Sequence, residues 1–470
     1  MLERLLFKKV ELWVVFVILL LGLVGTLLFA MAVADLMIGK NRFGPLAPAV
    51  RQVVSAHSTV AELVKETRSP GRALLARNQR HAEAAGFDFA YDAGTRPEAP
   101  YLLVNRFDRD RLKSVSELVD LDAQTVVHSW VYDPDPIWQD STLDTPLVDL
   151  AVDRATARFR GTHALVEPDG EVVVHGMGSP LLKFDLCGDL LWQQDEVVYH
   201  HSIEVDAEGN YWVPAQLIPK TVDLGGADFM DDGIVQVSPE GEILSSRSVI
   251  GILDDNGLSH LIYGHGWEQA DPIHLNDIQP VMEDGPIWQA GDLFLSVRNR
   301  SLVLLYRPAT DEIVWHQAGP WIHQHDIDIL DDRRISVFDN AARLISTEAP
   351  SCPAWRDTDP CLDTPERNRR TVVDLVDGTV SDTYAAAFTA NQIVTHKQGL
   401  QEISPDGTLF VEETNLGRML AATEDGTVAW SYVNRAETDG RVYTLNWSRL
   451  VDRATGDAVR ARLDGGTCDG

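Results

Sequence analysis

The first hundred positions show two helical patterns of hydrophobic and polar residues. From Leu12 to Ala34 no charged residue interrupts a run of 23 residues. At about 1.5 Å per residue, a helix of this length spans the ~30 Å hydrocarbon layer of a membrane. Between Gly44 and His81 apolar residues recur every three or four positions, with a break at Ser69–Gly71. These patterns predict a membrane-spanning segment in residues 1–40 and a stalk of two short amphipathic helices, followed by a linker, in residues 41–100.

Residues 101–470 instead repeat short apolar strands separated by turns. Six segments place a turn before a strand, and they end at Trp130, Trp192, Ser246, Trp315, Tyr384 and Trp430. Hairpin-like units, in which an acidic turn joins two apolar runs, begin at His163, His201, His325 and Leu400. Most of these turns contain Asp-Gly or Glu-Gly, which favour hairpins because glycine accepts the positive φ that such turns often require.

Strand–turn–strand units repeated about every 50–70 residues are typical of a β-propeller, whose blades are four-stranded sheets around a channel. The six terminal segments predict an all-β fold, a six-bladed β-propeller over residues 101–470. The tail Gly440–Gly456 is expected to add a strand to the first blade, because closing the ring removes exposed strand edges. A sandwich or a two-domain β protein is the alternative.

Composition narrows the class of partner. The 470 residues include 40 Lys and Arg against 71 Asp and Glu, a net charge of −31, and 44% of them are hydrophobic. This hydrophobic content supports a packed core. The acidic balance argues against nucleic acid or anionic lipid as the main partner. An anionic ligand would therefore depend on local positive charge.

The N-terminus indicates transport across a membrane. Arg4, Lys8 and Lys9 precede the apolar run, so the positive-inside rule keeps the N-terminus in the cytoplasm. We expect a single-pass inner-membrane protein, held in the membrane by this helix, with a periplasmic C-terminal domain. A cleaved signal peptide is the alternative, because Ala30–Ala32 resembles a small-residue cleavage site.

The four cysteines agree with an oxidising compartment. Cys352 and Cys361 bracket a short polar loop, which predicts a local disulfide. Cys187 and Cys468 either pair or stay free. None of the cysteines has the spacing of a zinc site.

Histidines recur at one position of the repeat. His163, His201 and His325 begin the strand before the acidic turn, and His274 opens a similar apolar run. Arg298 follows the next strand, "LFLSV". Equivalent positions in successive blades of a propeller point at one place in the channel. We therefore expect these side chains to converge on one anion, although a lone histidine at such a position more often caps a strand and Arg298 alone could form an ion pair.

Several motifs, in their order along the chain, resemble the bacterial arylsulfate sulfotransferases. They are "HHSIEVDAEGNYWV", "HLND", "SVRNRS", "QHDIDIL" and "ISVFDN", and the resemblance covers about Tyr101 to Asp452. The family consists of exported six-bladed propellers that use no nucleotide sulfate donor. In place of the family's N-terminal β-sandwich, this chain has the predicted stalk.

The resemblance implies a nucleotide-independent sulfotransferase that moves a sulfuryl group from an aryl sulfate to a phenolic acceptor, with no cofactor and no metal. It implies that His201 and His274 are channel histidines, that Arg298 is the arginine at the sulfuryl group, and that His325 becomes sulfated. Asn276, His323 and Asn340 are expected to bind substrate. The neighbouring histidines leave open whether His325 or His323 is the nucleophile.

Three alternatives remain from the residues themselves. The pair His323 and His325 could bind Zn²⁺ or Cu²⁺, but alternate residues of a strand face opposite sides. A non-catalytic propeller anchored in the membrane could serve as a binding or assembly module. A hydrolase of similar architecture would need metal-binding carboxylates, or the Cys/Ser-x-Pro-x-Arg motif of a typical sulfatase, which is absent from the sequence.

Overall fold

The computed structural model describes residues 11–37, 77–78, 80–133, 141, 143, 145, 150, 154, 159–224, 229–264, 270–344, 362–364, 367–466 and 468. The chain forms two compact units, residues 1–74 and residues 75–470. In the first, helix α2 (Leu12–Met37) is long and apolar enough to cross a membrane. A membrane anchor and a signal sequence both fit this helix. The predicted stalk helices lie almost entirely outside the described residues.

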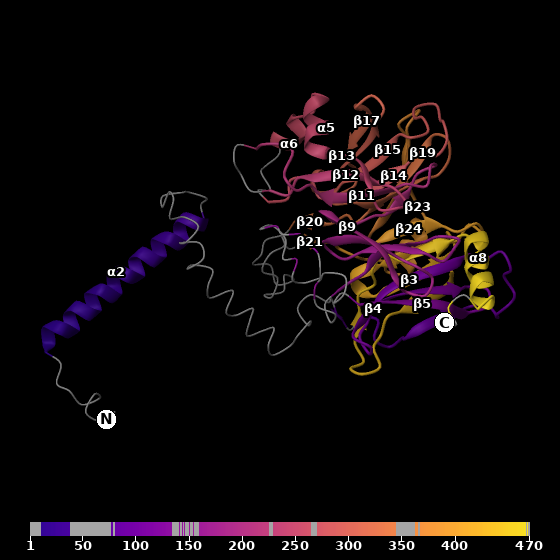
Figure 1. Cartoon of the computed structure of the whole chain (residues 1–470), viewed down its shortest axis with the longest axis horizontal. Helices are drawn as coiled ribbons and strands as arrows, with labels where there is room; N and C mark the ends of the chain where they lie inside the picture. The colour runs from indigo at the N-terminus through magenta and orange to yellow at the C-terminus, as the bar shows by residue number, and fades with distance from the viewer. Residues whose placement is uncertain are drawn as a thin grey trace. The chain divides into compact units, whose positions relative to one another are not determined.

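The second unit consists mostly of antiparallel strands arranged like the blades of a propeller (Figure 1). Four sheets have four or five strands each. The first contains β29 (Arg449–Val451), β3 (Tyr101–Asp108), β4 (Lys113–Asp120) and β5 (Thr125–Tyr132), and the second contains β14 (Leu275–Pro280), β15 (Leu293–Val297), β16 (Leu302–Arg307) and β17 (Glu312–Ala318). The third contains β18 (His325–Ile329), β19 (Arg334–Asp339), β22 (Arg369–Asp374) and β23 (Val380–Thr383). The fourth contains β2 (Gly86–Phe89), β27 (Val428–Val433), β26 (Arg418–Ala422), β25 (Leu409–Glu413) and β24 (Leu400–Ile403).

A larger sheet of eight strands joins the remaining two stretches of the repeat. Its path is β13 (Ile243–Ser248), β12 (Asp232–Val237), β11 (Tyr211–Gln216), β9 (Leu190–Tyr199), β8 (Ser179–Phe184), β7 (Val172–His175) and β6 (Thr162–Val166), and β10 (Glu204–Val205) pairs with β11. Two small sheets pair β1 (Arg77–Asn78) with β28 (Val442–Tyr443) and β20 (Arg343–Leu344) with β21 (Leu362–Asp363).

The repeat found in the sequence corresponds to these strands. Its six terminal segments lie on β5, β9, β13, β17, β23 and β27. The hairpins predicted from acidic turns are the pairs β6–β7, β10–β11, β18–β19 and β24–β25. The turn glycines Gly170, Gly209 and Gly407 have φ of 87°, 87° and 82°. The prediction of a mostly-β propeller is confirmed, whereas the number of six blades stays a prediction.

The end of the chain returns to the first sheet, as expected. In the tail, β29 pairs antiparallel with β3, with Arg449 opposite Leu103. Helix α8 (Arg453–Asp464) then packs beside this sheet (Figure 1). A Cβ on Gly456 would lie 2.1 Å from the ring of Tyr101, so only glycine allows this close approach.

Three short helices of this unit were not predicted: α5 (Val249–Asp255), α6 (His260–Tyr263) and α7 (Ala385–Ala390). The residues Val249–Leu253 are all buried in a core with β14, β15 and β16. Such a run has no polar side, so its hydrophobic pattern cannot distinguish a helix from a buried strand.

A disulfide joins Cys187, in the turn between β8 and β9, to Cys468 after α8, with 5.4 Å between the Cα atoms. The predicted bond between Cys352 and Cys361 lies outside the described residues. We expect Cys468→Ser to lower the free energy of unfolding by about 2–5 kcal/mol, because the bond closes a loop of 281 residues. Urea denaturation without reductant measures this effect, and Cys187→Ser should match it. Equal stability of wild type and both variants would contradict the prediction.

Candidate active site

Six residues at the start of the inner strands share an unusual backbone conformation. Each has a left-handed φ between 52° and 68°, and the set consists of His163, His201, His274, His323, Gln398 and Trp447. They lie in or just before β6, β10, β14, β18, β24 and β29. A positive φ costs a residue other than glycine on the order of 1–3 kcal/mol, and such residues cluster at functional sites. We call this set the left-handed ring.

Four side chains of this set, those of His163, His201, His274 and Trp447, lie close to one another and to His325. The ring centroids of His201 and His274 are 5.0 Å apart, and those of His201 and His325 are 6.4 Å apart. The centroid of His163 lies 6.4 Å from that of His201 and 3.9 Å from that of Trp447, with the two planes tilted by 32°. Trp447 is 6.1 Å from His325. Histidines that are 38 to 124 positions apart in the sequence are therefore neighbours, as their common register predicted.

His325 is held in one tautomer. Its Nδ1 lies 2.7 Å from Oδ1 of Asn340, whose amide nitrogen donates to the carbonyl oxygens of Thr395 and Gln398. The Asn340 oxygen therefore faces the ring, and Nδ1 carries the proton. Nε2 keeps its lone pair and accepts a 3.2 Å hydrogen bond from the backbone N–H of Gln398. Burial, followed by the charge of Arg298, lowers the pKa of His325 well below its usual value, so the ring is neutral and nucleophilic at neutral pH.

Arg298 supplies the positive charge of this cluster. It begins the 3-10 helix η2 (Arg298–Arg300), directly after β15, and is 7% exposed. Its Nη1 donates to Oδ1 of Asn299 over 2.8 Å, and its backbone N–H donates to the carbonyl oxygen of His274. A buried guanidinium beside the neutral imidazole of His325 attracts an anion, and its planar fork suits two oxygens of a sulfate ester.

The other expected substrate-binding residues have defined contacts. Asn276 and Asn340 are fully buried. The Asn276 amide donates to the carbonyl oxygen of Gln324 over 2.8 Å, so it holds the loop that carries both histidines of this segment. His323 donates from Nδ1 to the carbonyl oxygen of Ala342 over 2.7 Å. The geometry gives these three residues contacts with the protein, and contact with substrate stays a prediction.

The comparisons with known proteins agree with this geometry. A family model described as Arylsulfotransferase (ASST) matches residues 161–435, which include Arg298 and all the clustered histidines. The chain belongs to the arylsulfotransferase family. A search of curated proteins finds no match.

A search of solved structures finds matches to the arylsulfotransferase chain at low sequence identity. A protein of unknown function from Bacteroides caccae has a TM-score of 0.44 and 12% identity, over 75% of this chain and 99% of that one. Virginiamycin B lyase from Staphylococcus aureus has a TM-score of 0.33 and 11% identity, over 58% and 70%. TolB from Acinetobacter baumannii has a TM-score of 0.39 and 9% identity, over 85% and 73%.

Two further histidines support this arylsulfotransferase site. His200 and His201 face each other through their Nδ1 atoms at 2.8 Å, and Nε2 of His200 is 3.4 Å from Asp232. His175 contacts the carbonyl oxygen of His201 through Nε2 at 2.8 Å. Burial, followed by the charge of His200, lowers the pKa of His201 well below its usual value. The repeat pattern missed His175 because it ends a second strand instead of beginning a first one.

Two carboxyl groups on the same inner strands, the buried Asp277 and the half-buried Asp326, connect neighbouring strands. Asp277 accepts from the backbone N–H of Ile327, and Asp326 accepts from that of Gln401, both over 2.7 Å. Burial, with the nearby carboxylates, raises the pKa of both groups. These contacts run from one sheet to the next, so they position the histidine-bearing strands of the arylsulfotransferase.

Among the described residues, one group of carboxylates has ligand atoms close enough for a metal ion, and it consists of Glu167, Asp169 and Glu171. The ammonium of Lys183 lies 2.8 Å from Glu167 and 2.7 Å from Glu171. The ammonium of Lys183 therefore balances the negative charge of these carboxylates, as a metal ion would. The histidine cluster of the arylsulfotransferase is not part of that group.

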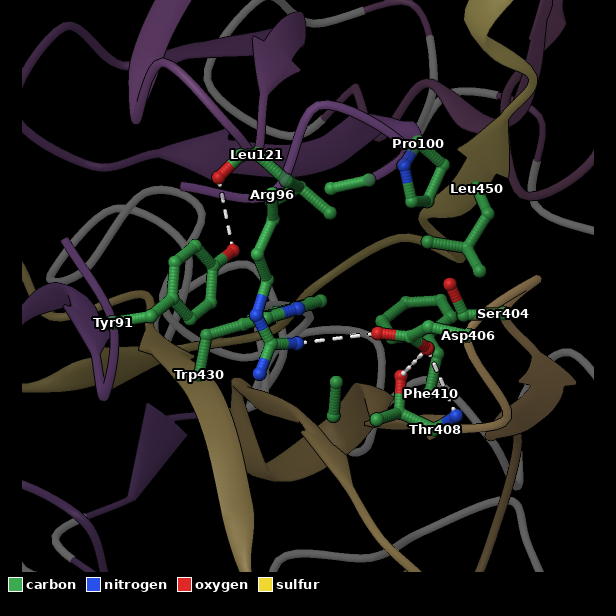
Figure 2. Close-up of a pocket in the computed structure, with 12 residues that line it drawn as sticks. Tyr91, Arg96, Pro100, Leu121, Ser404, Asp406, Thr408, Phe410, Trp430 and Leu450 are labelled. Atoms are coloured by element: carbon green, nitrogen blue, oxygen red, sulfur yellow. Dashed lines mark hydrogen bonds and ion pairs between the residues drawn. The ribbon is translucent and has the colours of Figure 1, made fainter. Parts of the chain in front are cut away.

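A pocket elsewhere in the second unit is lined by aromatic and polar side chains (Figure 2). Arg96 crosses it, 4.4 Å above the ring of Tyr91 and 3.2 Å from the carboxylate of Asp406. None of its lining residues belongs to the left-handed ring. We therefore place the candidate active site of this arylsulfotransferase at the histidines.

Proposed function

We propose that this protein is a nucleotide-independent arylsulfate sulfotransferase. It moves a sulfuryl group from an aryl sulfate to a phenolic acceptor through a sulfohistidine on His325. The observation that carries the proposal is the fixed tautomer of His325, which presents the Nε2 lone pair in a cluster that contains Arg298. A neutral, oriented imidazole is an effective nucleophile, and a guanidinium beside it stabilises the transferring oxyanion.

In the first step the hydrogen bond from the backbone N–H of Gln398 to Nε2 of His325 opens, and the freed lone pair attacks the sulfur of the donor. The N–S bond forms, the S–O bond to the aryl group breaks, and the electron pair leaves with the phenolic oxygen. A histidine of the left-handed ring protonates this oxygen, so a neutral phenol departs. Nδ1 of the sulfated ring keeps its proton on Asn340, and the ring carries a positive charge that offsets the negative sulfuryl group.

The second step is the reverse of the first, with an acceptor phenol in place of the phenol that left. The histidine that gave up its proton accepts the phenolic proton while the phenolic oxygen attacks sulfur. The N–S bond breaks and the electron pair returns to Nε2. Because the two steps together exchange one aryl sulfate for another, the protein needs orientation and fixed charge more than it needs a strong driving force.

The setting of this chemistry is part of the proposal. In the eight-stranded sheet, β9 and β11 pair through only two residue pairs, Tyr199 with Ala215 and Val198 with Gln216. Counting that sheet as two blades gives a six-bladed propeller over residues 101–470. The apolar helix α2 would anchor the protein in the inner membrane with the propeller in the periplasm, and the disulfide between Cys187 and Cys468 suits that compartment.

Mixing the protein with an aryl sulfate donor alone tests this function directly. We expect intact-mass analysis to find one acid-labile sulfuryl group per chain, located on His325 by peptide mapping, and an added phenol to remove it. A protein that releases phenol without ever carrying the group would contradict the two-step reaction. Absence of any turnover would favour a binding module on the propeller scaffold.

A further inference from the structure

An aspartate outside the repeat pattern contacts one of the clustered histidines. Oδ2 of Asp271 accepts the hydrogen of His274 Nδ1 in a short hydrogen bond. The backbone carbonyl of Asp271 accepts from the amide of Asn299 over 2.7 Å, and the oxygen of that amide accepts from Arg298. Asp271 therefore contacts the imidazole through its carboxylate and is linked to the guanidinium through its backbone carbonyl and Asn299.

The surroundings keep this aspartate ionised. Burial alone would raise the pKa of Asp271, but the charges of His274, His200 and Arg298, together with the hydrogen bond from His274, lower it. Three histidines also interact with His274 in the described part of the chain. His201 lies 5.0 Å away between ring centroids. The charge of His274 contributes to lowering the pKa of His323 and of His325, after the larger effects of burial and of Arg298.

We propose that Asp271 is a positioning residue that makes His274 the histidine that exchanges the proton with the phenolic oxygen. The inference rests on the proposed function and deepens it. With Nδ1–H donated to the carboxylate, Nε2 of His274 gives its proton to the departing phenolic oxygen as the S–O bond breaks, and takes a proton from the acceptor phenol in the second step. The negative charge of Asp271 stabilises the imidazolium form of His274, which exists before the first transfer and again after the second.

Exposure distinguishes His274 from His325, and a carboxylate partner distinguishes it from its neighbour His201. The side chain of His274 is 28% exposed, whereas that of His325 is buried. A phenol that leaves the cluster therefore has access to His274. His201 has its Nδ1 against His200, and burial favours its neutral form. Of the two, His274 alone has a carboxylate on its ring in the described part of the chain.

The experiment compares two donors with the variant Asp271→Asn. Phenyl sulfate has a poor leaving group that needs a proton, and 4-nitrophenyl sulfate has a good one that does not. We expect Asp271→Asn to slow transfer from phenyl sulfate by about 10²-fold and transfer from 4-nitrophenyl sulfate by less than about tenfold. Equal losses with both donors would overturn the inference.

Two further variants keep the result interpretable. His274→Asn should show the same dependence on the leaving group, since asparagine tolerates the left-handed backbone at φ 53°. Combining it with Asp271→Asn should cause no further loss, because the two residues act as one unit. Asp255→Asn, which removes an exposed partner of Arg247, should leave both rates unchanged. Wild-type protein that transfers from neither donor refutes the proposed function, while transfer from both with equal losses in the variant refutes only the role of Asp271.

Discussion

Replacing His325 with alanine is expected to slow sulfuryl transfer by at least about 10³-fold and to abolish the sulfuryl adduct. In His325 the contact with Asn340 fixes the proton on Nδ1 and leaves a lone pair on Nε2. Within the described ranges, none of the other clustered histidines has its tautomer fixed by such a pair of contacts. Without the imidazole of His325, Arg298 can still bind the aryl sulfate, but the protein has no nucleophile to attack its sulfur. Rates with 4-nitrophenyl sulfate and a phenol, together with intact-mass analysis, measure both effects.

Two comparison variants make this result specific. His316→Ala removes an exposed histidine from the outer strand β17, and it should leave the transfer rate unchanged. His323→Ala removes the neighbouring candidate nucleophile and should leave the adduct on His325 in place. If His325→Ala still carries the sulfuryl group and His323→Ala does not, the nucleophile is His323 and the assignment made from the tautomer is wrong. The unfolding midpoint of each variant separates chemistry from loss of fold.

The strands could be predicted because local chemistry specifies them. Alternating apolar residues on either side of Asp-Gly or Glu-Gly predict a hairpin wherever it occurs, and β6–β7 and β24–β25 follow this rule. The return of β29 to β3 followed from the need to cover a strand edge. The pairing of β9 with β11 could not be predicted, because it joins two neighbouring units and depends on how they sit side by side.

From the sequence, site residues could be predicted only where the same residue type, histidine, recurs at one position of the repeat. His201, His274 and His325 shared a register that the sequence displays. Gln398 and Trp447 occupy equivalent places in the left-handed ring, but a search for repeated histidines passes over them. Asp271 was missed for another reason: it lies three positions before His274, and the sequence contains many aspartates that only cap turns. Its contact with the imidazole is a property of the folded loop.

The substitution Arg298→Lys is expected to slow transfer by about 10²–10³-fold while the protein still folds, because an ammonium is a point charge and cannot hold two sulfuryl oxygens as a planar fork does. The loss should appear in both half-reactions, since each passes through the same sulfuryl geometry, and rapid-quench measurement of adduct formation and decay can resolve them. Arg307→Lys is the matched control, because Arg307 donates to both carboxylate oxygens of Asp292, at 2.8 and 2.7 Å, in the same sheet. In Arg307→Lys, loss of the two hydrogen bonds to Asp292 should lower the free energy of unfolding and leave the transfer rate unchanged. Near-normal transfer by Arg298→Lys would mean that its charge serves the structure of the histidine cluster, and that the sulfuryl oxygens are held by other donors.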